Sequence, residues 1–321
     1  MPGLCRITLP VALLGFVLAR PVFSQPTPLF QFAFGGEGTE DGQLDRPKGI
    51  DIQGDEVFVV ENANYRVSVF DLAGNFLRNF GSSGMGPGQF VFPLHVVVAT
   101  DGTSYVTDYL RHYVLKFDPA GDFVLEWGGQ GSADEELNNP QGIEIDEDGD
   151  IWVVDRTNNA VKEFDSDGVF KSKIEGGQPM VGITDVKLNS DGSFFGTIWA
   201  GSYTGMRLFD AAGAALDSSA SQFSAPQGLA QAPDGVLYVV SIGPTNRGYA
   251  LDPATLDLII SWGGFGPEDE NLNRPSDIDV TENGKIYVVA EESDLIKVFE
   301  VPVFADGFES GDTSGWSASV P

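Results

Sequence analysis

Three features of the sequence predict an all-β fold, a six-bladed β-propeller made of four-stranded antiparallel blades. A module of about 46 residues recurs six times. Within each module, short runs alternate apolar and polar residues, as half-buried strands do. Asp-Gly and Asn-Gly pairs separate many of these runs and are strong signals for hairpin turns. A pair of stacked sandwiches would not need the same signature six times, so we expect a closed ring of blades.

Each module opens on a short β-run that follows a Pro, with Ile in its place in the fourth module. The openings are RPKGIDI from Arg46, FPLHVVV from Phe92, NPQGIEI from Asn139, ITDVKL from Ile183, APQGLAQ from Ala225 and RPSDIDV from Arg274. A second landmark, an aromatic residue followed by an acid, ends the third run of most modules. Its acids are Asp71, Asp118, Asp165, Asp210 and Glu300. The two landmarks keep the same spacing, which predicts four strands per module.

The last module lacks its fourth run, because the pattern stops at Glu300. A run with the missing pattern, LFQFAFG at residues 29–35, precedes the first module and has no module of its own. We therefore expect the N-terminal strand 29–35 to complete blade six and close the ring, which would leave no unpaired edge at the seam.

The two ends of the chain differ from the repeats, which divides it into residues 1–24, 25–300 and 301–321. Residues 1–24 have the pattern of a signal peptide, with Arg6 before an apolar run and small residues before Gln25. A buried strand is the alternative, but Pro10 and Gly15 disfavour it. We expect a secreted, periplasmic or cell-surface protein. Cleavage would also remove Cys5, the single cysteine, and no other segment is apolar enough to span a bilayer.

The C-terminal segment, residues 301–321, is rich in Gly, Ser and Asp and shows no apolar alternation, so we expect a flexible tail. Its DGFESGD motif, followed by a Trp-Ser pair, resembles a short tail found on unrelated secreted bacterial proteins. The resemblance implies a role in sorting or processing. A disordered stub without a function is the alternative interpretation.

The charge of the chain excludes several classes of partner. Its 18 Lys and Arg residues face 47 Asp and Glu residues, for a formal net charge of −29. Such a polyanion repels nucleic acid and anionic membrane surfaces. We expect neither as a partner, and we expect a monomer.

The landmarks together resemble NHL repeats over about residues 29–300. They comprise a P-x-G-I strand, a V-V-D-x-x-N-x-x-V step, the aromatic-acid pair and a Gly-rich loop. The resemblance implies the propeller fold but leaves function open, because the family includes lyases, lactonase-like relatives, receptor sensor domains and RNA binders. Modules four and five depart from the pattern, since Ile198 and Ser241 stand where Asp108 and Asp155 stand in modules two and three.

The first strands hold a candidate metal site. In the resembling lactonases, esterases and amidating lyases, ligands lie mainly at the mouth of these strands, where this chain has weak ligands: Lys48, Leu94, Gln141, Thr184, Gln227 and Ser276. One position further along, modules one, three and five have Gly, and modules two, four and six have His95, Asp185 and Asp277. These three residues could hold Ca²⁺ or Zn²⁺ at the channel axis. The alternative is that they pack between blades and accept loop N–H groups.

The loops between second and third strands are expected to form a binding rim, because aromatic and arginine side chains are typical of interface hot spots. We predict contacts from Trp199 and Tyr203 above all, although the aromatic residues could instead cover blade edges. The predicted rim is Tyr109, Arg111, His112, Gln141, Arg156, Trp199, Tyr203 and Gln227, near Tyr65 and Arg247.

Together these features predict an exported binding or scaffold module for a protein, glycan or small molecule, without a cofactor. The alternative is a metal-dependent lactonase, esterase or lyase-like enzyme that uses His95, Asp185 and Asp277 at the central channel. The two hypotheses differ in whether the protein holds a stoichiometric metal ion.

Overall fold

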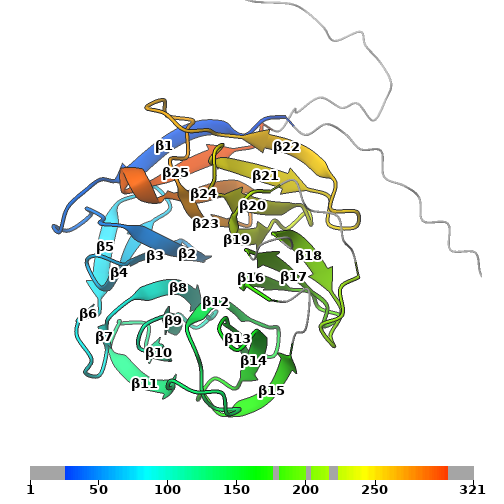
Figure 1. Cartoon of the computed structure of the whole chain (residues 1–321). Helices are drawn as coiled ribbons and strands as arrows, with labels where there is room; N and C mark the ends of the chain where they lie inside the picture. The colour runs from blue at the N-terminus through cyan, green and yellow to red at the C-terminus, as the bar shows by residue number, and fades with distance from the viewer. Residues whose placement is uncertain (1–25, 176–180, 200–203, 217–222, 303–321) are drawn as a thin grey trace, which may run out of the picture.

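The computed structural model describes residues 26–175, 181–199, 204–216 and 223–302. These residues form an all-β ring of six antiparallel sheets around a central channel (Figure 1), so the predicted six-bladed propeller is confirmed. The signal-peptide prediction for residues 1–24 and nearly all of the predicted tail lie outside the described residues. No helix within the described ranges has the length and apolar character needed to cross a membrane.

Blades one, two and three each contain four strands, with the first strand at the channel. Blade one consists of β2 (Pro47–Gln53), β3 (Glu56–Glu61), β4 (Arg66–Asp71) and β5 (Phe76–Phe80). Blade two consists of β8 (Pro93–Val98), β9 (Ser104–Asp108), β10 (Tyr113–Phe117) and β11 (Phe123–Gly128). Blade three consists of β12 (Pro140–Ile145), β13 (Ile151–Asp155), β14 (Ala160–Phe164) and β15 (Phe170–Glu175).

Blades four and five follow in the same order around the ring. The described part of blade four has β16 (Ile183–Leu188), β17 (Phe194–Ile198) and β18 (Gly205–Phe209), followed by an antiparallel bridge between Phe209 and Ala215. Blade five consists of β19 (Pro226–Gln231), β20 (Leu237–Ser241), β21 (Arg247–Leu251) and β22 (Leu258–Trp262).

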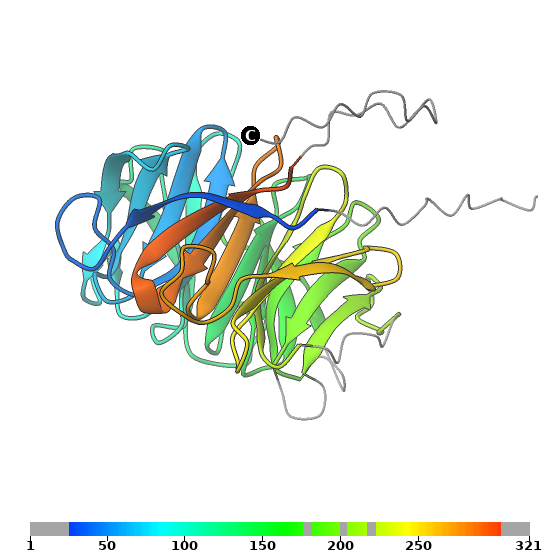
Figure 2. The same cartoon turned by 90° about the horizontal axis from the view of Figure 1, so that it is seen from above.

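Blade six combines strands from both ends of the described chain. It consists of β23 (Pro275–Val280), β24 (Lys285–Ala290), β25 (Leu295–Glu300) and β1 (Leu29–Gly35). Figure 2 shows β1, in dark blue, running along the outer edge of the ring beside β25. A short 3-10 turn, η2 (Glu291–Ser293), joins β24 to β25.

The hydrophobic core is divided among the interfaces between blades. Among the described residues, one cluster of buried apolar side chains lies at each of the six interfaces. The strand β3 shows how alternation produces this arrangement, because successive side chains point to opposite faces of a sheet. Val57 and Val59 pack toward blade six, whereas Phe58 and Val60 pack toward blade two.

The aromatic-acid landmark has a local structural cause. Asp71 ends β4, and its Oδ1 accepts the N–H groups of Ala73 and Asn75, at 2.9 and 2.8 Å. Gly74 supplies the left-handed conformation that the turn requires, with φ of 81°. Asp118, Asp165 and Asp210 form the same turn in the next three blades.

The loops that connect successive blades fold back on themselves at one end of the channel. The loop between blades one and two contains a short parallel pair, β6 (Ser82–Ser83) and β7 (Gln89–Phe90). Equivalent parallel bridges join Glu37 to Leu44 and Gln130 to Leu137. This face of the propeller holds the sites described next.

Candidate functional site

The predicted trio of His95, Asp185 and Asp277 meets at the channel axis. One ligand atom from each of the three side chains lies within 4.8 Å of the other two. His95 Nδ1 lies 3.5 Å from Asp277 Oδ2. The residues come from β8, β16 and β23, the inner strands of blades two, four and six. Two carboxylates and an imidazole at this separation form a donor set suited to a transition metal.

Close packing of the inner strands explains why only alternate blades carry a side chain at this level. Gly49, Gly142 and Gly228 occupy the position in blades one, three and five. A Cβ atom added to Gly142 would lie 2.7 Å from the Cα of Asp185, and one on Gly228 would lie 2.7 Å from the Cα of Asp277. Six side chains therefore do not fit in this ring, whereas three do.

The two aspartates also hold neighbouring blades together. Asp185 Oδ2 accepts the N–H of Leu229 in blade five, at 3.1 Å. Asp277 Oδ2 accepts the N–H of Ile50 in blade one at 2.9 Å, and its Oδ1 accepts the N–H of Ile278 at 2.9 Å. A carboxylate oxygen has two lone pairs, so these bonds leave capacity for another ligand. Asp185 and Asp277 are called the channel carboxylates below.

Burial determines the protonation of this group. Burial raises the pKa of Asp185 to about 8. Burial and the nearby Asp185 charge raise the pKa of Asp277 well above its usual range. Burial and the Lys48 ammonium lower the pKa of His95 to about 4, so its imidazole is neutral at pH 7. A neutral imidazole can donate a lone pair to a metal ion, and a bound cation would favour the ionised carboxylates.

A second layer of charge lies deeper in the channel. Lys187 Nζ pairs with Glu144 Oε1 at 2.6 Å, which joins blades three and four. Asp51 Oδ2 accepts the N–H of Val98 at 3.0 Å, and Asp279 Oδ2 accepts the N–H of Ile52 at 2.7 Å. Lys187 therefore already supplies a cation to this layer.

Above the trio, the channel opens into a cavity of about 240 Å³ that we call the mouth pocket. Every blade contributes to its wall, which includes five of the six predicted mouth positions of the inner strands. The lining residues are Lys48, Phe92, Leu94, His95, Tyr109, Gln141, Arg156, Trp199, Gln227, Ile242, Arg274, Ser276 and Glu291. Apolar walls with a few converging polar groups are typical of small-molecule sites.

Hydroxyl groups fix the shape of the mouth pocket. Thr107 Oγ1 donates to the carbonyl of Gln141 at 2.8 Å, which links blades two and three. Thr197 Oγ1 donates to the carbonyl of Gln227 at 2.7 Å, and Ser276 Oγ donates to the carbonyl of Lys48 at 2.8 Å. The same bond thus recurs at every second interface, and the pocket wall is preformed.

The mouth pocket contains five of the eight predicted rim residues: Tyr109, Gln141, Arg156, Trp199 and Gln227. Tyr203 lies outside the described residues. Sequence reasoning missed Arg274 and Glu291. Glu291 directly follows the second strand of its blade, as Tyr109 and Arg156 do in theirs, so the repeat offered a signal for it. The Arg-Pro pair that opens the sixth module was a usable signal for Arg274, because residues beside that Pro lie at the mouth.

Arg111 and His112, also predicted for the rim, do not line the mouth pocket. Arg111 is buried, pairs with Glu126 at 2.8 Å and donates to the carbonyl of Gln89. His112 Nδ1 accepts the N–H of Asn139 at 3.0 Å. Both side chains therefore contact the loops around blade two.

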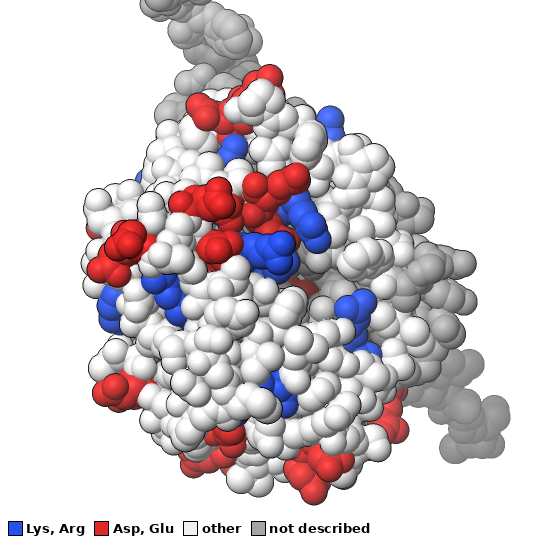
Figure 3. Space-filling model, turned by 60° about the vertical axis from the view of Figure 1, so that its left-hand side comes forward, with Lys and Arg blue, Asp and Glu red and all other residues white. Residues whose placement is uncertain are grey.

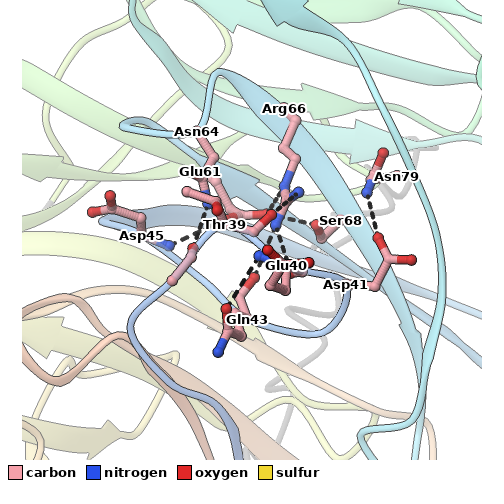
Figure 4. Close-up of polar contacts among 11 residues, drawn as sticks. Thr39, Glu40, Asp41, Gln43, Asp45, Glu61, Asn64, Arg66, Ser68 and Asn79 are labelled. Carbon is pink, nitrogen blue, oxygen red and sulfur yellow. Dashed lines mark hydrogen bonds and ion pairs between the residues drawn. The ribbon is translucent and has the colours of Figure 1, made fainter.

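Three further carboxylates bind the loops from inside the protein, and we call Glu61, Asp108 and Asp155 the loop anchors. They end the second strands of blades one to three and are fully buried. Figure 4 shows the first anchor, where Glu61 pairs with Arg66 at 2.7 Å and accepts the N–H of Asp45. These contacts assign the Asp of the V-V-D step a structural role.

The other two anchors also accept loop N–H groups, and of these two only Asp155 has an ion pair among the described residues. Asp155 pairs with Lys162 at 2.9 Å and accepts the N–H of Asn138 at 2.7 Å. Asp108 accepts the N–H groups of Val91 and Phe92. Each anchor therefore fixes the loop that precedes its own blade.

Another group of acids has a local partner and is no metal candidate. Ligand atoms of Asp146, Asp150 and Glu163 lie within 4.8 Å of one another. Lys171 Nζ pairs with both Asp150 and Glu163, so a cation is already present. More widely, Figure 3 shows acidic side chains in separate patches over the surface, with fewer basic ones among them.

Comparisons with known proteins agree with the repeat assignment. Residues 137–164 match the NHL repeat family, and residues 37–102 match a family described as "6-bladed beta-propeller". The RING finger protein nhl-1 of Caenorhabditis elegans is 46% identical over 57 residues, which are 17% of this chain and 6% of that protein. The protein brain tumor of Drosophila melanogaster is 32% identical over 82 residues, which are 25% of this chain and 8% of that protein.

Solved structures show the same fold at low sequence identity. A streptogramin B lyase matches with a TM-score of 0.60 and 17% identity, over 85% of this chain and 88% of that one. A catalytically inactive virginiamycin B lyase from Staphylococcus aureus, solved with quinupristin, matches with a TM-score of 0.59 and 15% identity, over 87% and 90% of the two chains. These similarities establish the fold alone.

Proposed function

Because the chain is an NHL-repeat six-bladed β-propeller, we propose that it acts as an exported binding module whose ligand occupies the mouth pocket. The observation that carries this proposal is a preformed cavity of about 240 Å³ to which all six blades contribute. Side chains from six separate loops and strands converge there on a rigid ring. Such scaffolds keep the fold constant while the loops determine what is bound.

Trp199 provides the sharpest test of this function. Its side chain is 45% exposed at the pocket wall, where a bound ligand would cover it. We expect compounds that raise the melting temperature of the mature chain to lose at least tenfold in affinity in Trp199→Ala. Phe265→Ala is the matched control, since Phe265 is also exposed (65%) but lies outside the pocket. Ligands that bind both variants equally would contradict the proposed site.

The trio of His95, Asp185 and Asp277 favours a second candidate function, metal-assisted catalysis of the lactonase, esterase or lyase type. Ligands of a tetrahedral Zn²⁺ lie about 3.4 Å apart, and the separation of His95 Nδ1 and Asp277 Oδ2 is 3.5 Å. A metal bound there would act as a Lewis acid at the floor of the mouth pocket. Asp185 and Asp277 would orient the metal ion, because backbone N–H groups already fix the positions of their carboxylates.

Elemental analysis distinguishes the two candidates. The mature chain is dialysed against metal-free buffer, and its metal content and melting temperature are measured with and without a chelator. About one metal ion per chain, lost in His95→Ala, would support the enzyme and justify screens of lactones and esters. An unchanged melting temperature and no metal after incubation with Zn²⁺ or Ca²⁺ would eliminate the metal site and leave the binding function.

A further inference from the structure

The mouth pocket reverses the charge of the protein around it. The whole chain carries a formal net charge of −29. The pocket wall, by contrast, contains three basic side chains, Lys48, Arg156 and Arg274, and one acidic side chain, Glu291. With His95 neutral, the wall has a formal charge of +2. A cleft of one sign focuses the field and attracts ligands of the opposite sign.

Two of the basic groups share the single acid. Lys48 Nζ lies 2.6 Å from Glu291 Oε1, and Arg274 Nε lies 3.3 Å from Glu291 Oε2. Lys48 and Arg274 also line an adjoining cavity with other acids, namely Glu37, Asp45, Glu292 and Asp294. Both cations therefore have acids nearby, and the uncompensated charge of the wall lies elsewhere. Lys48 is also largely buried, and that burial lowers the pKa of its ammonium. An anion beside Lys48 would restore part of the solvation that the ammonium loses.

Arg156 holds the remaining charge on the opposite part of the wall. Its guanidinium has no ion pair among the residues that the structure describes, although its side chain is half-buried. A guanidinium offers a planar fork of donors that matches a carboxylate or a phosphate group. Arg156 thus presents to the cavity a guanidinium that has no acidic partner among the described residues and can bind an anion.

Apolar groups occupy the rest of the wall. The rings of Phe92 and Tyr109 lie 6.0 Å apart, and Trp199 remains 45% exposed. Leu94 and Ile242 complete this surface. Aromatic walls beside a charged fork suit a ligand with one anionic end and one apolar end.

We propose that the mouth pocket binds a small organic oxyanion, a carboxylate or a phosphate ester, which carries an aromatic or apolar group. This inference rests on the proposed binding function and specifies its ligand class. The oxyanion pairs with Arg156 and faces Lys48 and Arg274, while the apolar group contacts Trp199 and Tyr109. The volume of about 240 Å³ is below the range of roughly 300–1,000 Å³ usual for drug-sized ligands, so the ligand is small.

Calorimetric titration with matched probes tests the inference. The probes are phenylacetate and indole-3-acetate, their uncharged primary amides, and phenyl phosphate. We expect each anion to bind at least tenfold more tightly than the amides, with an affinity that falls as salt is added. Arg156→Gln should weaken the anions roughly tenfold and leave the amides unchanged. Lys285→Gln, which removes a positive charge outside the pocket, is the control.

The outcomes separate this inference from the function on which it rests. One outcome would overturn the anion preference and preserve the binding pocket. In it, the amides bind as tightly as the acids, their affinity falls in Trp199→Ala, and Arg156→Gln leaves it unchanged. Probes that bind the Trp199→Ala and parent proteins equally would overturn both. The ratio of phenyl phosphate to phenylacetate affinity identifies which oxyanion the site prefers, and either preference supports the proposal.

Discussion

The loop anchors and the channel carboxylates are both buried acids, but the protein treats them in opposite ways. Glu61 and Asp155 each pair with a cation within 3 Å and accept a loop N–H. Asp185 and Asp277 accept backbone N–H groups and have no Lys or Arg partner among the described residues. The anchors therefore use their charge to hold loops, whereas burial raises the pKa values of the channel carboxylates and favours their protonated form.

The difference indicates where to look for function. A buried acid with a full set of partners is explained by structure. A pair of acids whose pKa values are raised, beside a neutral imidazole and below an open pocket, is the pattern expected of a working site. The repeat unit itself does not make this distinction, because both kinds of acid lie on regular strand positions.

The largest expected effect tests whether the loop anchors and the channel carboxylates both require a closed ring of blades to stay in place. Deleting residues 25–36 removes β1, including the buried Phe34 and the partly buried Phe30 and Phe32. At about 1.5–3 kcal/mol per buried side chain, the free energy of unfolding should fall by roughly 5 kcal/mol, and β25 would become an exposed edge. Urea denaturation measures the loss.

The control for this deletion removes residues 308–321, a similar length of chain that includes none of the described strands. This truncation should leave the unfolding midpoint unchanged. An N-terminal truncation that also unfolds like the parent would show that the seam strand does not stabilise the ring.

The next effect measures a loop anchor directly. Asp155→Ala leaves the buried ammonium of Lys162 without its carboxylate. Breaking a buried pair in this way costs about 3–5 kcal/mol, which urea denaturation would report. Ser241→Ala, at the corresponding position of blade five, removes two long hydrogen bonds between neutral groups, from the N–H of Ala225 at 3.4 Å and to the carbonyl of Ile242 at 3.2 Å, and should cost about 1–2 kcal/mol. Equal losses would end the distinction between anchored and unanchored blades.

Counting residues from the start of each module predicted the positions of His95, Asp185 and Asp277 because the inner strands share one geometry. Each inner strand has a register irregularity near its first residue, as between Pro47 and Ile50, and a bulge that recurs in every blade preserves relative position. The meeting of the three side chains at the axis followed from that repetition and the sixfold arrangement.

Loop residues could not be predicted in the same way. The side chain of Arg111 turns inward to Glu126, whereas that of Arg156 lines the pocket, although both follow the second strand of their blades. Spacing separates these two arginines only once the modules are aligned. Arg156 directly follows Asp155, as Tyr109 follows Asp108 and lines the same pocket, whereas Arg111 lies three residues after Asp108. Their directions depend on partners from other loops, which only the folded ring brings together.

A smaller effect tests how the channel carboxylates are positioned. Gly142→Ala would place a Cβ 2.7 Å from the Cα of Asp185, a backbone atom that cannot move alone. Overpacking of this kind costs about 1–3 kcal/mol. Gly131→Ala is the control, since the three atoms nearest its new Cβ belong to the flexible end of Glu136, whose carboxylate accepts the N–H of Ala133. Denaturation should show a loss below about 1 kcal/mol for the control, and equal losses would contradict close packing as the reason for glycine here.

The smallest effect concerns pH. The folded-state pKa of Asp185, about 8, lies above its ordinary value of 3.8, so the folded protein binds the proton more tightly than the unfolded chain. The stability that this proton provides is lost as pH rises through 8. Between pH 6.5 and 8 the loss should reach about 1–2 kcal/mol. The lowered pKa of His95, about 4, acts in the opposite direction. The unfolded imidazole, with an ordinary pKa of 6.5, loses its proton between pH 6.5 and 8, which offsets about 0.4 kcal/mol of the loss.

Asp185→Asn should reduce that loss, because the amide keeps an acceptor for Leu229 and cannot ionise. Thermal unfolding at pH 6.5 and 8, with chelator present, measures the slope for the parent, for Asp185→Asn and for the exposed control Asp55→Asn. Repeating the series with Zn²⁺ sharpens the comparison, since a metal ion would stabilise the ionised carboxylate and reverse the sign of the slope in the parent and in Asp55→Asn but not in Asp185→Asn. A parent protein whose stability is constant over this range would mean that the channel acids are compensated as fully as the loop anchors.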